Sequence, residues 1–145
     1  MREISLQHRV EYRAFCIVRA ILAILPEGFA VRLGALAGLL VGSVLRIRRR
    51  EVDEHLTHVF PDESAAWRRR VARGSYMHLG REAVVLFRMG LWSKAGVADR
   101  VRFVDFQMVR DAAAEERGVV LLTGHLGNWE VAGAGIAALG LPIDV

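Results

Sequence analysis

The stretch Gly118-Val-Val-Leu-Leu-Thr-Gly-His-Leu-Gly-Asn-Trp-Glu130 decides the fold expected for this chain. Residues 119–123 form a short, almost wholly apolar run with two β-branched valines, and the run ends at Gly124. An Ala- and Gly-rich segment follows Asn128. This order predicts a buried strand, a tight turn and then a helix. His125 is therefore expected at the carboxyl end of a strand, where open α/β sheets place their reactive groups.

The spacing of His125 and Glu130 adds a chemical expectation. On one continuous helix, side chains five residues apart differ in direction by about 140° and cannot meet. They can meet if His125 lies in the turn and Glu130 lies in the first turn of the helix. Asn128 suits the N-cap of that helix, and the positive end of the helix dipole favours Glu130. The pattern predicts an imidazole oriented by a carboxylate, with one ring nitrogen left to accept a proton.

The spacing alone also allows other interpretations. His58 and Glu63 have the same separation, but they straddle Phe60-Pro61 and follow no strand, which is typical of a solvated loop pair. His125 could equally be a turn histidine that bonds local backbone. Zinc is disfavoured because no third His or Cys stands at a familiar ligand spacing.

A wider pattern connects these residues to a known family. Gly124 to Glu130 closely resembles the signature of the bacterial lipid A late acyltransferases, the lauroyl and myristoyl transferases of the glycerophosphate and lysophospholipid acyltransferase superfamily. The blocks His55-Leu-Thr-His-Val-Phe-Pro-Asp62 and Ser75-Tyr-Met-His-Leu-Gly-Arg-Glu82 also resemble blocks of that family. His55 and His78 stand where the family pattern has asparagine. The resemblance runs from about Arg9 to the last residue.

The resemblance implies O-acyl transfer from an acyl thioester to a hydroxyl group of a lipid A precursor, with acyl carrier protein as the expected donor and acyl-CoA as the alternative. His125 would act as the general base and Glu130 would fix its tautomer. Backbone amides near Gly127 and Asn128 would bind the substrate by stabilising the tetrahedral oxyanion, although Gly127 could serve turn geometry alone. This chemistry requires no metal or tightly bound cofactor. Trp129 is expected to be a core or interface anchor.

Three other functions remain open from the sequence. One is an acyl-CoA-dependent acyltransferase that acts on another glycolipid or phospholipid, such as a phosphatidylinositol mannoside. The second is a non-catalytic, membrane-bound interaction module, in which substitutions at His125 and Glu130 would affect only stability. The third is a metal-dependent hydrolase, which would lose activity on chelation.

Composition limits the class of partner. The 145 residues are 53% apolar and 25% charged, and 20 basic residues exceed 16 acidic ones. This balance suits anionic partners, including a phospholipid surface, a phosphorylated saccharide lipid or an acidic carrier protein. No recognition signature supports nucleic-acid binding. A single cysteine, Cys16, excludes a disulfide framework.

The amino-terminal third predicts two apolar helices, at about 9–25 and 27–46, that lie in or partly cross a membrane. The longest uninterrupted apolar run, Leu33 to Leu45, has 13 residues, fewer than the roughly 20 that span a bilayer. The four arginines that follow within residues 46–50 favour the cytoplasmic side. We therefore expect the cell inner membrane, with the catalytic part facing the cytoplasm. The alternative is a buried helical hairpin of a soluble domain, because glycines at 34, 38 and 42 suit close helix packing.

Two further helices are expected in the middle of the chain. Residues 48–57 are compatible with a helix that Phe60-Pro61 ends, and Asp62 can cap a second helix over 63–89. The charged side of this second helix includes Arg68, Arg69, Arg70 and Arg73, a run that is typical of a solvated face but could bind headgroups.

The last third predicts strands at 101–104, 119–123 and 141–145, with a helix at 106–117 and another after Asn128. This βαβαβ order indicates an α/β fold with parallel pairing, a layer of the glycerophosphate acyltransferase kind. We expect one acyltransferase unit over 1–145, comprising a membrane-associated helical region at 9–46, a helical region at 47–98 and the start of the catalytic α/β layer at 99–145. Because Val145 falls in a newly begun strand, and the resembled family is longer, we expect an amino-terminal half with an incomplete sheet.

Overall fold

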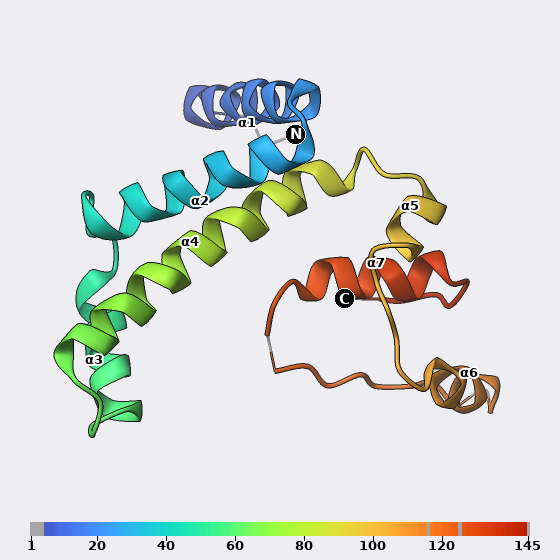
Figure 1. Ribbon diagram of the computed structural model, residues 1–145. Coiled ribbons are helices and arrows are strands. Elements are labelled where there is room, and N and C mark those ends of the chain that lie inside the picture. Colours follow the sequence, from blue (N-terminus) through green and yellow to red (C-terminus); the bar gives the residue numbers. More distant parts are fainter. Residues whose placement is uncertain (1–4, 116, 125, 145) are drawn as a thin grey trace. The chain divides into compact units, whose positions relative to one another are not determined.

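The computed structural model describes residues 5–115, 117–124 and 126–144. These residues form helices joined by turns and extended segments (Figure 1). The chain divides into two compact units, Met1–Arg88 and Met89–Val145, and each unit is described by itself.

The amino-terminal unit begins with two apolar helices. Helix α1 spans Leu6–Ile24, and the side chain of its N-cap residue Ser5 accepts a hydrogen bond from a first-turn backbone N–H at 3.3 Å. Helix α2 spans Glu27–Ser43. Pro26 separates the two helices, because proline has no backbone N–H with which to continue α1. Both helices were predicted, and their bounds agree within three residues. Within the described residues, no helix combines the length and apolar character that a bilayer crossing requires.

Two more helices complete this unit. Helix α3 spans Arg49–Val59, and Phe60 follows it as the C-cap residue, so the predicted end at Phe60-Pro61 is confirmed. Helix α4 spans Ala65–Met89, and its last residue belongs to the second unit. The hydroxyl group of Ser64 accepts a hydrogen bond of 3.1 Å from a first-turn N–H of α4. Ser64, and not the predicted Asp62, therefore provides the side-chain cap of this helix.

Glycines bring α2 and α4 into close contact. A Cβ atom placed on Gly38 would overlap the carbonyl group of Tyr76, and one placed on Gly34 would overlap the carbonyl group of Gly80. Gly80 faces Gly34 in the same way from the other helix. The two backbones can approach this closely because Gly34, Gly38 and Gly80 carry no side chain. The close helix packing that the glycine spacing suits therefore occurs, but it is made with α4 and not within a hairpin of the first two helices.

Apolar and polar contacts fasten α1 to the rest of the unit. Leu22, Ala30 and Val84 form a small buried cluster, and the Phe15 and Phe87 rings lie 5.0 Å apart between centroids. The Arg88 guanidinium donates to the carbonyl oxygens of Leu22 and Leu25 at the carboxyl end of α1, with 2.9 Å to Leu25. These carbonyls have no partner within their own helix, so the arginine satisfies them. Many apolar side chains of α1 stay exposed, including Val10, Phe15, Ile17, Val18, Ile21 and Ile24.

The carboxyl-terminal unit contains three shorter helices, α5 (Lys94–Ala98), α6 (Phe106–Ala114) and α7 (Trp129–Ala138). Helices α5 and α7 pack together. A Cβ atom on Gly135 of α7 would meet the Val101 side chain at 2.9 Å, which shows how closely α7 approaches the segment after α5. Helix α6 confirms the predicted helix at 106–117, although it ends three residues earlier.

The prediction of an α/β layer is wrong for the residues that the structure describes. None of the predicted strand segments at 101–104, 119–123 and 141–144 pairs with another, and the described chain is helical with no sheet. A strand exists only when a neighbour completes its hydrogen-bond ladder. Without that neighbour, Val120 and Leu122 are 87% and 95% exposed instead of buried. The apolar, β-branched run at 119–123 therefore has strand propensity, but no second strand pairs with it among the described residues.

Candidate functional site

The turn that precedes α7 has the local geometry expected from its sequence. Gly127 adopts a φ of 66°, in the left-handed region that favours glycine. A Cβ atom there would meet nothing within 4 Å, so the backbone conformation and not close contact requires glycine. The side-chain oxygen of Asn128 accepts a hydrogen bond of 3.1 Å from the backbone N–H of Val131. The predicted N-cap at Asn128 is therefore confirmed.

Glu130 lies in the first turn of α7, as the sequence predicted, and it is half-buried. The positive end of the helix dipole stabilises a carboxylate at this position. His125 lies outside the described residues, so its pairing with Glu130 stays a prediction. The catalytic roles of both residues, and the substrate-binding roles of Gly127 and Asn128, stay predictions as well.

The segment before the turn differs from expectation. Residues 119–124 are extended but belong to no strand, so the premise that His125 follows a strand of a sheet is wrong for the described residues. The turn instead precedes α7, which packs against α5 and also, through Gly135, against the Val101 side chain just after α5. Arg110 of α6 adds a hydrogen bond of 3.2 Å to the carbonyl oxygen of Leu139 just after α7. Helices therefore position Glu130 in this unit.

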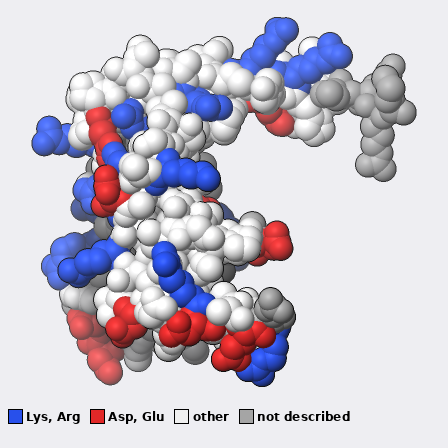
Figure 2. Space-filling model, turned by 90° about the vertical axis from the view of Figure 1, so that its right-hand side faces the viewer, with Lys and Arg blue, Asp and Glu red and all other residues white. Residues whose placement is uncertain are grey.

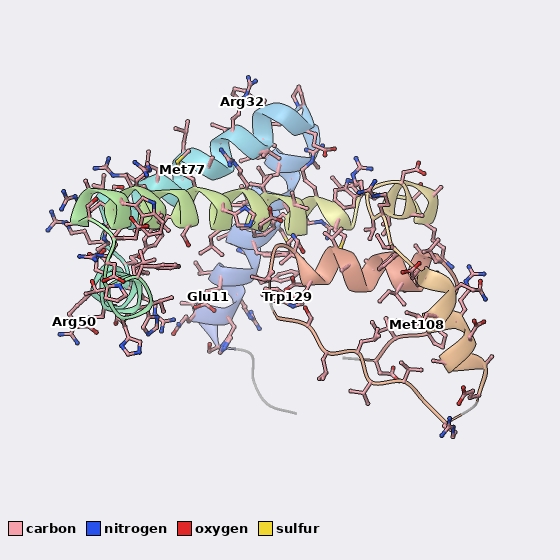
Figure 3. All side chains as sticks on the ribbon, turned by 60° about the horizontal axis from the view of Figure 1, so that its bottom comes forward. Glu11, Arg32, Arg50, Met77, Met108 and Trp129 are labelled. Atoms are coloured by element: carbon pink, nitrogen blue, oxygen red, sulfur yellow. The ribbon has the colours of Figure 1, made fainter. Side chains whose placement is uncertain are left out.

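Trp129 is the first residue of α7 and remains 42% exposed (Figure 3). A large indole exposed beside the turn suits contact with an apolar ligand or an interface more than burial in a core. The predicted role of Trp129 as a core or interface anchor stays a prediction.

A second histidine–carboxylate pair occurs in the amino-terminal unit. His78 Nδ1 lies 3.5 Å from Glu82 Oε1 on the surface of α4. Both residues lie in a block that resembles the family pattern, but their pairing was not predicted from the sequence. Their separation of four residues inside a long predicted helix was the available signal, because such residues share one helix face.

The other pair with this spacing, His58 and Glu63, is exposed to solvent as predicted, although His58 lies in a helix and not in a loop. His58 lies in the last turn of α3 and Glu63 in the following turn, and both are exposed. No ion pair joins them among the described residues. His58 and Glu63 have the same spacing as residues 125 and 130, but they do not meet, because the chain leaves helix α3 between them at Phe60-Pro61. Nor does the described part of the chain gather three or more potential metal ligands of the His, Cys, Asp or Glu type.

A comparison with known protein families independently supports the family resemblance seen in the sequence motifs. The chain matches the family model of the bacterial lipid A biosynthesis acyltransferases over residues 2–142. No curated protein and no solved structure matches it significantly. The matched range includes the stretch from Gly124 to Glu130 and both upstream blocks that resemble the family pattern. The chain therefore belongs to the bacterial lipid A biosynthesis acyltransferase family.

Proposed function

We propose that this protein transfers a fatty acyl group from an acyl thioester, with acyl carrier protein as the donor, to a hydroxyl group of a lipid A precursor. The family match over residues 2–142 carries this proposal, because it supports an acyltransferase of lipid A biosynthesis, which requires an acyl donor and a lipid acceptor. The position of Glu130 in the first turn of α7 also supports it.

The proposed chemistry uses His125 as general base. Its imidazole takes the proton of the acceptor hydroxyl while the hydroxyl oxygen attacks the thioester carbonyl carbon. Glu130 holds the imidazole in the correct tautomer and stabilises the imidazolium that forms. The tetrahedral oxyanion then collapses, the carbon–sulfur bond breaks, and the imidazolium returns its proton to the departing thiolate.

Gly127 and Asn128 are proposed to form the substrate-facing side of this turn. The left-handed backbone at Gly127 and the capped start of α7 support this role, because the first turn of a helix has free backbone N–H groups and the positive end of the dipole, both of which favour an anion. Such amides stabilise an oxyanion without any reorganisation during the reaction.

We also propose that the protein acts at the cell inner membrane, with its catalytic part on the cytoplasmic side. Exposed apolar side chains along α1 support an association in which helices lie on the lipid surface. The arginines after α2 support the cytoplasmic orientation.

The test is transfer of a labelled acyl group to a lipid A precursor by protein expressed from its complete reading frame, with acyl carrier protein and acyl-CoA thioesters as separate donors. His125→Ala should lower the rate by about 10²–10⁴-fold, the usual contribution of a general base. Glu130→Ala should also lower the rate of acyl transfer.

His58→Ala is the matched control, because His58 has the same spacing from an acidic residue but makes no pair with it. Its rate should equal that of the parent. Parent-like transfer by a folded His125→Ala protein would contradict the mechanism, and transfer from acyl-CoA alone would contradict the proposed donor.

A further inference from the structure

A small cavity in the amino-terminal unit is strongly basic. It encloses about 310 Å³ where the connection between α2 and α3 meets α4. Its charged lining consists of Arg46, Arg49, Arg69, Arg73 and Asp53. Four guanidinium groups from three parts of the chain therefore face one space with a single carboxylate.

Most of this positive charge has no internal partner. Arg49 pairs with Asp53 at 2.9 Å, and its side chain is only 19% exposed. Among the described residues, no ion pair or hydrogen bond is made by the side chains of Arg46, Arg69 or Arg73. Three guanidinium groups without an internal partner favour the binding of an anion.

The spacing on α4 strengthens this conclusion. Arg69 and Arg73 are four residues apart on one helix, so they lie on the same face and repel each other. Their neighbour Arg68 is used differently, because it donates to the carbonyl oxygens of Phe60 and Pro61 at 3.0 and 3.3 Å. An anion bound between Arg69 and Arg73 would attract both guanidinium groups and so offset their mutual repulsion.

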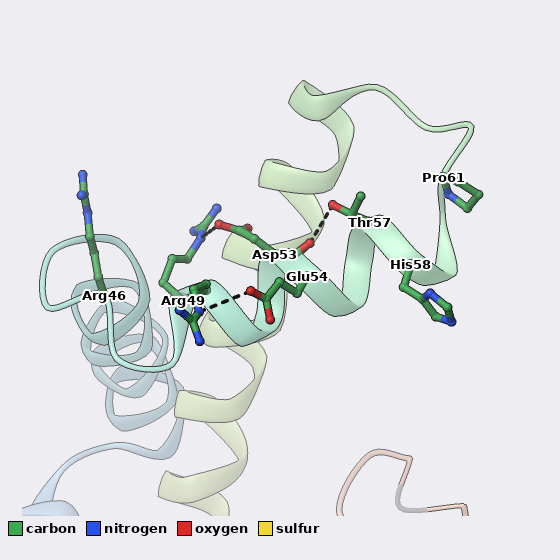
Figure 4. A pocket seen from close by; sticks show the side chains of 8 residues that line it. Arg46, Arg49, Asp53, Glu54, Thr57, His58 and Pro61 are labelled. Carbon is green, nitrogen blue, oxygen red and sulfur yellow. Dashed lines mark hydrogen bonds and ion pairs between the residues drawn. The ribbon is translucent and has the colours of Figure 1, made fainter.

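A larger cavity beside this one is less suited to an anion (Figure 4). It encloses about 960 Å³, but Arg49 and Arg50 on its wall are paired with Asp53 and Glu54, the second pair at 3.3 Å. Figure 2 shows another face of the protein, the right-hand side of Figure 1, where acidic side chains also lie among basic ones. The smaller cavity is thus distinguished by uncompensated charge and not by size.

Exposed apolar side chains adjoin the basic cavity. Val44, Leu45 and Ile47 occupy the connection between α2 and α3, next to Arg46, and are 67%, 58% and 51% exposed. Free phosphate offers nothing for these side chains to contact, whereas a lipid offers both an anionic headgroup and an apolar region. Basic and apolar residues side by side are typical of binding at a membrane interface.

We propose that Arg46, Arg49, Arg69 and Arg73 bind the phosphate group of an anionic lipid, while the apolar connection contacts its hydrocarbon region. Guanidinium groups suit this role because their planar N–H donors match phosphate oxygens two at a time. The proposal rests on the membrane association proposed above but not on acyl transfer.

The test is flotation of the full chain with phosphatidylcholine vesicles that either contain or lack phosphatidylglycerol. Arg69→Gln/Arg73→Gln should weaken binding to the phosphatidylglycerol vesicles by about 25-fold, because each basic residue near such a surface contributes about fivefold. Binding to phosphatidylcholine alone should not change. The circular dichroism spectrum should confirm that the variant is folded.

Arg32→Gln/Arg102→Gln is the charge-matched control, since both residues are exposed and lie outside the cavity. The Arg32 side chain points outward from α2 (Figure 3). This control should bind nearly as well as the parent. Equal losses in both double variants would overturn the site and leave general electrostatic attraction, whereas a parent that binds neither vesicle would overturn membrane association as well.

A titration with inorganic phosphate at constant ionic strength separates the two sources of the anion. Phosphate binding that depends on Arg69 and Arg73, combined with unaltered vesicle binding in their double variant, would assign the site to free phosphate and overturn the lipid proposal. Loss of vesicle binding in that variant supports it.

Discussion

Replacement of Gly38 by alanine tests the close crossing of α2 and α4. The new Cβ atom would lie 2.8 Å from the carbonyl carbon of Tyr76 and would overlap its oxygen. A backbone carbonyl cannot rotate away as a flexible side chain can, so the two helices must separate. Gly74 of α4 offers a matched control, because a Cβ atom there meets nothing within 4 Å.

The two substitutions should have opposite signs. Alanine in place of glycine inside a helix stabilises by about 0.5–1 kcal/mol, and Gly74→Ala should show this gain. Overpacking costs about 1–3 kcal/mol, and the rigid backbone at Gly38 favours the upper part of that range. Gly38→Ala should therefore be net destabilising, and the two variants should differ by about 2–3 kcal/mol in the free energy of unfolding.

Urea unfolding of the full chain, followed by far-ultraviolet circular dichroism, measures this difference. Thermal unfolding of the same two variants provides a second measurement, in which the midpoint temperatures should differ by about 4–12 °C, at roughly 2–4 °C per kcal/mol for a chain of this size. Equal stability of Gly38→Ala and Gly74→Ala would refute the packing of α2 against α4 described here.

Three further changes should have measurable effects. Tyr76→Phe removes the 2.6 Å hydrogen bond from the tyrosine hydroxyl to the carbonyl oxygen of Ile47, and it should lower the free energy of unfolding by about 0.5–1.5 kcal/mol in urea titrations. Asn128→Ala removes the cap of α7 and should cost about 1 kcal/mol. Amide exchange in the first turn of α7 should then accelerate, while Asn128→Ser should retain protection. Arg88→Met leaves the carboxyl end of α1 without its donor and should lower the midpoint temperature, whereas an unchanged midpoint would show that water replaces the arginine.

Local features of this protein could be read from its sequence because they depend on neighbouring residues. The proline at 26 divides two apolar runs, and helices occupy both sides of it. Asn128 caps α7 because its side chain reaches an N–H only three residues away. The family assignment was likewise accessible, since Gly124 to Glu130 is a contiguous motif.

The arrangement of distant residues required the tertiary structure. The run at 119–123 has strand propensity, but a strand also needs a paired neighbour, and the described residues provide none. From the sequence alone, the arginines at 68, 69, 70 and 73 are typical of one solvated helix face. Only the packing of α4 beside the α2–α3 connection separates Arg68, which binds local carbonyls, from Arg69 and Arg73, which face a basic cavity. The sequence determines which side chains the protein has. The packing of its helices determines which of them meet, because the distance between two side chains in space does not follow from their separation along the chain.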